Sequence, residues 1–164
     1  MMLDILIEAS GWREIAVDAL AKQAISQTLA QVSLPVEQVD ISLLACDDAR
    51  IVTLNEAFRG KPVATNVLSW PAVDLSAGIE GHAPAPPKPD FDGSFELGDI
   101  AIAYETCARE AVDLQKSLED HATHLIVHGL LHLLGYDHVR DRDATLMQAL
   151  ETEILGKMGV DDPY

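Results

Sequence analysis

Three histidines in the C-terminal third of the sequence have the spacing of a metal site. His128, His132 and His138 stand at offsets of zero, four and ten within one segment. Residues four apart on a helix share one face, so His128 and His132 present two imidazoles to the same ion. Gly135 lies between this pair and the third histidine, and glycine readily adopts the left-handed conformation that ends a helix. We therefore predict that the chain folds back after Gly135 and that all three imidazoles bind one metal ion.

The chemistry that this histidine set would support is that of a catalytic zinc ion. Three imidazoles with an open fourth position form such a site, which lowers the pKa of a bound water to about 7. The zinc peptidase motif H-E-x-x-H has its general-base glutamate directly after the first histidine, whereas this sequence has Gly129 there. The sequence therefore disfavours a peptidase. A glycine within a helix costs about 1 kcal/mol relative to alanine, so we expect Gly129 to leave room for a substrate or to allow close helix packing.

Four other polar residues have less specific expectations. Asp137 is expected either to orient a ligand imidazole as a hydrogen-bond acceptor or to be an exposed turn residue. His124 is four residues before His128, which makes it a candidate fourth ligand, but each such step rotates about 40° around a helix. We therefore expect His124 to pack or form hydrogen bonds beside the site, and we expect His121 and His82 to be solvated.

The composition limits the classes of partner. The chain has 164 residues, of which 48% are hydrophobic, and a net charge of −16. This length fits one domain with a substantial core. A field of this sign repels nucleic acid and anionic membranes, so an RNA site would have to be a local basic cleft. We expect no DNA partner and no membrane partner, and no stretch approaches the roughly 18 apolar residues of a membrane span.

The cysteines and the first residues indicate the compartment. Cys46 and Cys107 are 61 positions apart and form no C-x-x-C motif. This usage predicts reduced, buried thiols. The first eight residues lack the basic region and the long apolar run of a signal peptide. We therefore expect a cytoplasmic protein.

Hydrophobic periodicity predicts the elements that position the histidines. It indicates strands at 3–8, 39–45, 66–71 and 98–103, and helices at 13–31, 48–58, 104–115, 119–134 and 142–155. Asp47 and Asp141 are expected to cap two of these helices. Segment 72–95 is rich in proline and glycine, which predicts a long, mobile surface loop. Four strands interspersed with helices, without a repeat or linker, predict one domain over residues 1–164 with α/β-type layers.

Four blocks of sequence extend the argument beyond the histidines. They are Leu54–Lys61 (LNEAFRGK), Thr65–Pro71 (TNVLSWP), Leu97–Ile102 (LGDIAI) and His128–His138 (HGLLHLLGYDH). In this order they resemble the "LN…(Y/F)RG", "T-D-V-L-S-F-P", "L-G-D-I-x-I" and "H-G-x-L-H-L-x-G-Y-D-H" segments of the YbeY family of bacterial endoribonucleases, which act in ribosomal RNA maturation. Outside residues 54–138 the sequence agrees with the family only in pattern. Asn66 stands where the family usually has Asp, and Trp70 where it usually has Phe.

The resemblance implies a fold and a set of site residues. The fold would be α+β, a mixed four-stranded sheet surrounded by helices, with a zincin-like metal helix. One Zn²⁺ would be bound by His128, His132 and His138, and Arg59 would be functionally important. A guanidinium is a planar, charged, bidentate donor suited to phosphate, so we expect Arg59 to stabilise negative charge near the metal. The alternative is a surface ion pair at a helix end.

The resemblance also implies an activity. The protein would be a zinc-dependent, single-strand-specific endoribonuclease acting in ribosomal RNA maturation, including the 3′ end of 16S rRNA, and in ribosome quality control. Its partners would be ribosomal RNA and ribosomal proteins or the small ribosomal subunit. Two alternatives stay open: a metal-dependent hydrolase of a peptide or small molecule, and a non-enzymatic ribosome-associated protein with structural zinc.

Overall fold

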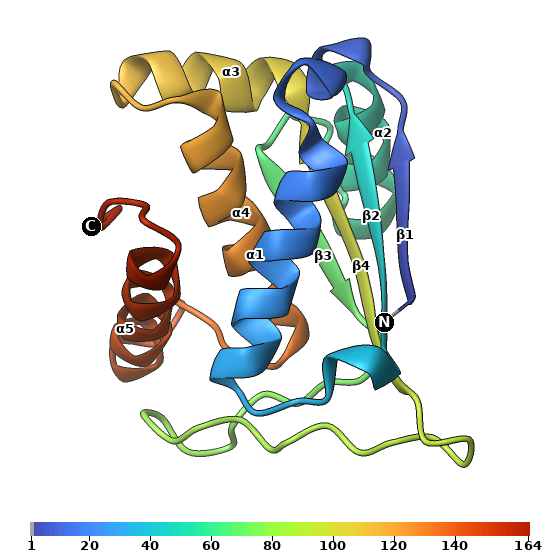
Figure 1. The fold of residues 1–164 in the computed structure, drawn as a ribbon, viewed down its shortest axis with the longest axis vertical. Coiled ribbons are helices and arrows are strands. Elements are labelled where there is room, and N and C mark those ends of the chain that lie inside the picture. The colour runs from blue at the N-terminus through green and yellow to red at the C-terminus, as the bar shows by residue number, and fades with distance from the viewer. Residues whose placement is uncertain (1) are drawn as a thin grey trace.

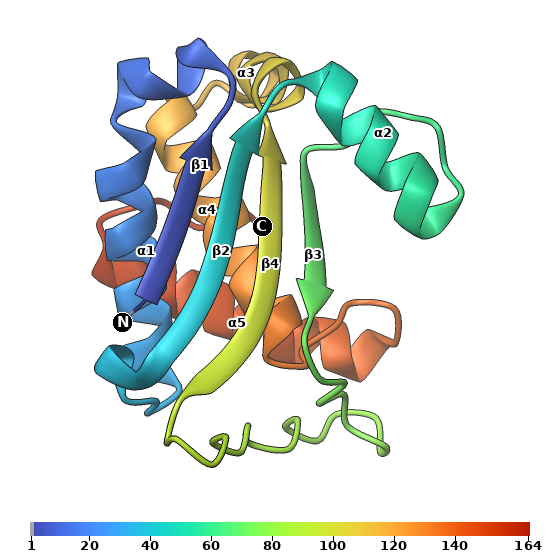
Figure 2. The ribbon, with the colours of Figure 1, turned by 90° about the vertical axis from the view of Figure 1, so that its right-hand side faces the viewer.

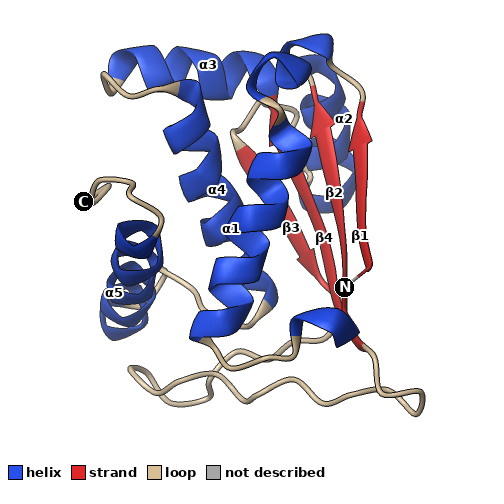
Figure 3. Ribbon diagram, viewed as in Figure 1, coloured by secondary structure: helices blue, strands red, loops and turns tan. Residues whose placement is uncertain are grey.

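A four-stranded sheet forms the centre of the molecule, with helices packed against it (Figure 1). The structure is a computed structural model that describes residues 2–164. The elements, in chain order, are β1 (Met2–Ile7), the 3-10 helix η1 (Ser10–Ile15), α1 (Val17–Gln31), the 3-10 helix η2 (Val36–Gln38), β2 (Val39–Cys46), α2 (Asp48–Arg59), β3 (Val67–Pro71), β4 (Phe95–Ala103), α3 (Tyr104–Asp113), α4 (Leu118–Leu133) and α5 (Asp141–Lys157). Figure 3 shows how helices, strands and loops are distributed.

The sheet is mixed, in the order β1-β2-β4-β3. β1 runs parallel to β2 and β2 runs parallel to β4, whereas β3 is antiparallel to β4 and forms one edge. The segment that connects β3 to β4 is the long loop at the lower end of the molecule (Figure 2). These observations confirm the predicted α+β fold with a mixed four-stranded sheet.

The two faces of the sheet are covered unequally. α1 and α4 pack against one face and form the main core, and α5 packs against α4 farther from the sheet (Figure 1). Alternate strand residues such as Leu43, Ile100 and Ile102 belong to this core, as the period-two pattern of a strand requires. On the other face a smaller cluster joins Ile51 of α2 to Leu68 of β3. α4 thus lies between the sheet and α5, and its buried side chains belong to the main core.

The starts of the first and the last predicted helices differ from the structure. The helix expected from residue 13 begins at Val17, because η1 precedes it and Ala16 has a left-handed backbone with φ of 49°. Trp12 is fully buried there, and its indole Nε1 donates to the Cys46 carbonyl at 2.9 Å. The prediction that Asp141 caps the last helix is wrong, because Asp141 is the first residue of α5, and Arg140 occupies the cap position without a side-chain cap hydrogen bond.

The predicted cap of α2 is confirmed. The Asp47 carboxylate accepts from the Arg50 amide at 2.8 Å at the start of α2, as expected of an N-cap. Gly60 ends α2 with φ of 67°.

Within residues 2–164, no helix combines the length and the apolar character needed to cross a membrane.

Candidate metal centre

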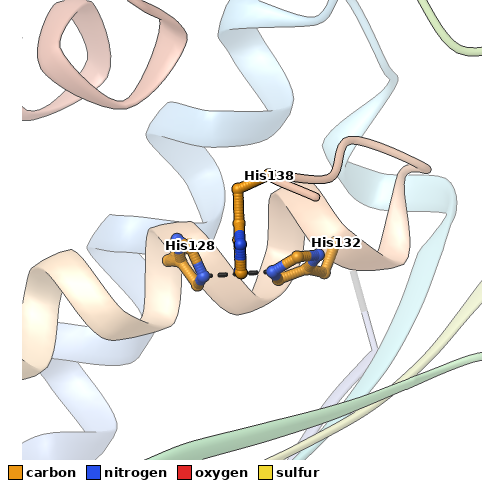
Figure 4. A group of neighbouring side chains, drawn as sticks. All are labelled: His128, His132 and His138. Atoms are coloured by element: carbon orange, nitrogen blue, oxygen red, sulfur yellow. Dashed lines mark hydrogen bonds between the residues drawn. The ribbon is translucent and has the colours of Figure 1, made fainter. Parts of the chain in front are cut away.

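The end of α4 delivers the three histidines to one place. The helix begins with the Ser117 hydroxyl accepting from the Asp120 amide at 3.1 Å. It ends at Leu133, after which Gly135 has φ of 98° and its amide donates to the His132 carbonyl at 3.0 Å. The chain then reverses direction and carries His138 back over α4 (Figure 4). This is the glycine-dependent reversal that the spacing predicts.

The three imidazoles converge on a common point. The Nε2 atoms of His128 and His132 lie 3.0 Å apart, and the ring of His138 stands beside both (Figure 4). The ring centroid of His138 is 5.4 Å from that of His128 and 5.1 Å from that of His132. One potential ligand nitrogen from each residue falls within 4.8 Å of the others. His128 and His132 are half-buried and His138 is exposed, so the group opens toward solvent on one side.

A buried carboxylate that the sequence analysis missed contacts the His128 ring of this group. Glu151 of α5 is fully buried, and its Oε1 accepts from His128 Nδ1 at 2.5 Å. Its Oε2 accepts from His124 Nε2 at 3.1 Å and from the Tyr164 hydroxyl. The sequence does contain a signal for this carboxylate. Glu151 lies four residues after Met147, on the face of the predicted helix that points toward the core. A charged residue on such a face is rarely buried without partners.

The protonation states around the site follow from these contacts. Burial alone would raise the pKa of Glu151, but hydrogen bonds from His124, His128 and Tyr164 outweigh it and lower that pKa to about 2. Burial, followed by repulsion from His128, lowers the pKa of His132 to about 4. His132 is therefore neutral near pH 7, which is the form of imidazole that binds metal ions.

Gly129 has a packing role. A Cβ atom at this position would lie 3.2 Å from Ile100 Cγ2 and 3.4 Å from Val67 Cγ2. The missing side chain therefore lets α4 approach β3 and β4 closely. Of the two expectations for Gly129, the structure supports close helix packing.

The remaining polar residues near the histidines have mixed outcomes. The Asp137 carboxylate is exposed and accepts from the His138 amide at 2.7 Å, so it is a turn acid that shapes the backbone at His138. His124 forms hydrogen bonds beside the site, as predicted. His82 is exposed, also as predicted. The expectation for His121 was wrong, because this side chain is buried and its Nε2 contacts Glu110 Oε1 at 2.9 Å.

Asn66 belongs to the same side-chain network as His121. Its amide nitrogen donates to Glu110 Oε1 at 3.0 Å, and its Oδ1 accepts from the Val67 amide at 2.7 Å. Asn66 therefore links the start of β3 to Glu110 of α3, which in turn contacts His121 of α4. An aspartate at this position would lose the donor that the Glu110 carboxylate uses.

The loop between β3 and β4, residues 72–94, is attached to the segment that carries His138. Arg140 Nη2 donates to the Ala77 carbonyl at 2.8 Å, and the Gly81 amide donates to Asp143 Oδ1 at 2.8 Å. A pocket of about 380 Å³ separates the two segments and is lined in part by His82 and Tyr136. The mobility expected of this loop stays a prediction, and these contacts define its position beside the histidines.

Arg59 is placed apart from the histidines in the fold. It is the exposed last residue of α2, whose buried Ile51 belongs to the cluster on the sheet face opposite α4 (Figure 2). Within residues 2–164, the structure shows no hydrogen bond or ion pair of its guanidinium. Arg59 is thus free to contact a ligand that reaches both α2 and the exposed side of His138, and its role stays a prediction.

Comparison with known proteins decides which family this arrangement represents. The family model for endoribonuclease YbeY matches residues 7–159. The chain belongs to the endoribonuclease YbeY family. An endoribonuclease YbeY of Ruegeria pomeroyi is 60% identical over 164 residues, which cover 100% of this chain and 98% of that protein. An endoribonuclease YbeY of Jannaschia sp. is 54% identical, with both chains covered completely.

A solved structure supports the fold independently. The solution structure of a Thermotoga maritima protein is similar to this chain with a TM-score of 0.57 and 20% sequence identity. The match covers 96% of this chain and 92% of the other. The fold thus also occurs at low sequence identity. Membership of the YbeY family agrees with the resemblance of the four sequence blocks.

Proposed function

We propose that this protein is a zinc-dependent endoribonuclease that cleaves single-stranded RNA. We further propose that it acts in ribosomal RNA maturation, at the 3′ end of 16S rRNA, and in ribosome quality control. Membership of the YbeY family supports the reaction class. The observation that carries the proposal is the convergence of His128, His132 and His138 on one point.

The donor set fits one Zn²⁺ ion. All three ligands are imidazole nitrogens, which zinc favours, and three protein ligands leave one position open. His128 Nδ1 donates to Glu151, so its Nε2 has a free lone pair on the side of His132. When bound, the ion supplies a Lewis acid for the phosphodiester and acidifies a water molecule.

The chain's own residues supply orientation and charge. Glu151 holds the His128 imidazole, and the turn at Gly135 returns the chain that carries His138. We propose that Arg59 contacts a phosphate of the bound RNA and stabilises the negative charge that develops during cleavage. Its exposed position at the end of α2 is compatible with an RNA strand that passes beside β3.

The proposed partners follow from family and charge. A net charge of −16 disfavours tight binding to bare RNA. We propose that the protein reaches ribosomal RNA through contacts with ribosomal proteins or the small ribosomal subunit, in the cytoplasm. The RNA itself would then contact only the surface that extends from the histidines past β3 to Arg59.

Two other functions are less well supported. A peptide hydrolase of the H-E-x-x-H type requires a glutamate where Gly129 packs against Ile100. A purely structural zinc site usually has four protein ligands. Among the described residues, the group around His128, His132 and His138 has no fourth histidine, cysteine or carboxylate ligand.

The test compares three proteins on a precursor of small-subunit ribosomal RNA and on casein, with metal content measured in parallel. Wild type should cleave the RNA and leave casein intact. His132→Ala should lose both zinc and RNA cleavage, because one of three ligands is gone. Arg59→Ala should retain zinc and lose cleavage. RNA cleavage by metal-free His132→Ala at the wild-type rate would contradict the metal-dependent reaction, and full activity of Arg59→Ala would contradict the role of that residue.

A further inference from the structure

The Glu151 side chain joins three separate parts of the fold. It projects from α5 toward α4, where Oε1 contacts His128 Nδ1 at 2.5 Å and Oε2 contacts His124 Nε2 at 3.1 Å. Tyr164 approaches from the C-terminal segment and donates its hydroxyl to Oε2. That segment is held to α5 in turn, because Thr152 Oγ1 donates to Asp162 Oδ1 at 3.2 Å. A fully buried carboxylate that accepts from a hydroxyl and faces two imidazole nitrogens is expected to be ionised, because the ionised form can accept a hydrogen bond from all three groups.

These contacts determine where the proton of His128 lies. An ionised carboxylate only accepts hydrogen bonds, so the nitrogen that faces it, Nδ1, must carry the proton. A neutral imidazole carries one proton, so Nε2 of His128 is left with a free lone pair. That Nε2 is the atom 3.0 Å from His132 Nε2, in the group that His138 completes. Glu151 thus acts on the metal centre indirectly, by contacting the ring nitrogen of His128 that does not face the proposed ion.

We propose that Glu151 is a positioning residue that fixes His128 in the Nδ1-protonated form and in the ring orientation that metal binding needs, and that Tyr164 holds the carboxylate in place. This inference deepens the proposed metal centre, and its consequence for zinc binding rests on that proposal. The tautomer of His128, in contrast, is a property of the metal-free chain. It also assigns a role to the C-terminal segment, which otherwise has no part in the site. Carboxylates that accept from a ligand imidazole orient the ring and raise its basicity.

A different arrangement of the same residues is the main competitor. His124, His128 and Glu151 also lie close enough to hold a cation themselves. In that case His128 would use both ring nitrogens as ligands, and the chain would bind two ions. The His124 contact of 3.1 Å lies in the ordinary range of a hydrogen bond, and the Tyr164 hydroxyl donates to the same carboxylate oxygen. We therefore favour one ion, with the Glu151 carboxylate as a hydrogen-bond acceptor rather than a ligand.

The experiment uses the full chain with three substitutions and one matched control. Glu151→Met fills a similar volume without an acceptor, Glu151→Gln keeps one acceptor oxygen, and Tyr164→Phe removes only the hydroxyl. Glu153→Met places the same new side chain at an exposed site two residues away. Nitrogen-15 NMR of the metal-free proteins reports the His128 tautomer. Competition with a chromophoric chelator gives the zinc affinity and the number of ions bound.

Wild type and Glu153→Met should show His128 protonated at Nδ1 and should bind one zinc ion with equal affinity. Glu151→Met should shift the proton away from Nδ1 and weaken zinc binding by roughly 10- to 100-fold. Glu151→Gln should recover part of both properties. Tyr164→Phe should weaken zinc binding by roughly two- to tenfold, and it serves as the decisive variant if Glu151→Met does not fold.

Two results would overturn the inference. One is a His128 tautomer and a zinc affinity that stay at wild-type values in both the Glu151 and the Tyr164 variants. The other is binding of two zinc ions by wild type with loss of one ion in Glu151→Met, which would make the carboxylate a ligand. If wild type bound no zinc, the proposed metal centre would be wrong, whereas a tautomer that follows Glu151 in the metal-free chain would still establish the positioning role.

Discussion

Replacement of Gly135 by alanine should disrupt the reversal that carries His138 to the metal centre. Gly135 has φ of 98°, and a Cβ atom there would lie 2.7 Å from both the carbonyl carbon and the carbonyl oxygen of Leu75. The backbone conformation costs a non-glycine residue about 1–3 kcal/mol. The contact involves backbone rather than a flexible side-chain end, so relieving it should cost about another 1–3 kcal/mol. We expect the free energy of unfolding to fall by roughly 2–6 kcal/mol, which lowers Tm by roughly 4–24 °C for a chain of this size.

The assay is urea unfolding and calorimetry of the metal-free protein, with Gly156→Ala as the matched control. Gly156 lies within α5, and a Cβ atom there would meet no atom outside its own helix within 4 Å. The same substitution there should stabilise the helix by up to about 1 kcal/mol. Gly135→Ala should in addition weaken zinc binding, whereas Gly156→Ala should leave it unchanged. Equal stability of the two variants, within about 0.5 kcal/mol, would refute the argument from the Gly135 backbone.

Two further predictions concern residues away from the histidines. Asn66→Asp should lower the free energy of unfolding at pH 7 by about 1–3 kcal/mol, because a donor to the Glu110 carboxylate is replaced by a second carboxylate. Asn66→Asp combined with Glu110→Gln should recover most of the loss. A free energy of unfolding of Asn66→Asp equal to that of wild type in chemical denaturation would contradict this. Burial raises the pKa of Cys46 to about 12 and raises the pKa of Cys107 further, so iodoacetamide at pH 8 should label neither thiol in the native protein and both in denaturant. Rapid labelling of either native thiol, followed by mass spectrometry, would contradict that account.

The convergence of the three histidines was predictable from sequence because these residues are close together in the chain. Two of them share a helix face, and a single glycine provides the turn for the third. Helical periodicity and glycine chemistry act over a few residues, so the spacing alone determines most of the geometry. The sheet strands were predictable for a related reason, since each is a short apolar run between turn signals.

The features that the sequence analysis missed depend on contacts between distant segments. Glu151 meets His128 only because α5 packs against α4, and Tyr164 meets Glu151 only because the C-terminal segment folds back. His121 is buried because Glu110 of α3 supplies its partner. Trp12 illustrates the same point for the backbone. The helical pattern alone predicts a continuous helix from residue 13, whereas in the structure the buried Trp12 lies in η1 and the left-handed Ala16 follows it.

The central claim is that His128, His132 and His138 together hold the one metal ion on which RNA cleavage depends. Its most direct test is a zinc titration of the metal-free protein, in which bound zinc and the cleavage rate of an unstructured RNA are measured on the same samples. The account predicts no cleavage without metal and a rate that rises in proportion to bound zinc up to one ion per chain, with neither property in His132→Ala. Full cleavage by the metal-free protein, or a zinc stoichiometry that is unchanged in His132→Ala, would contradict it.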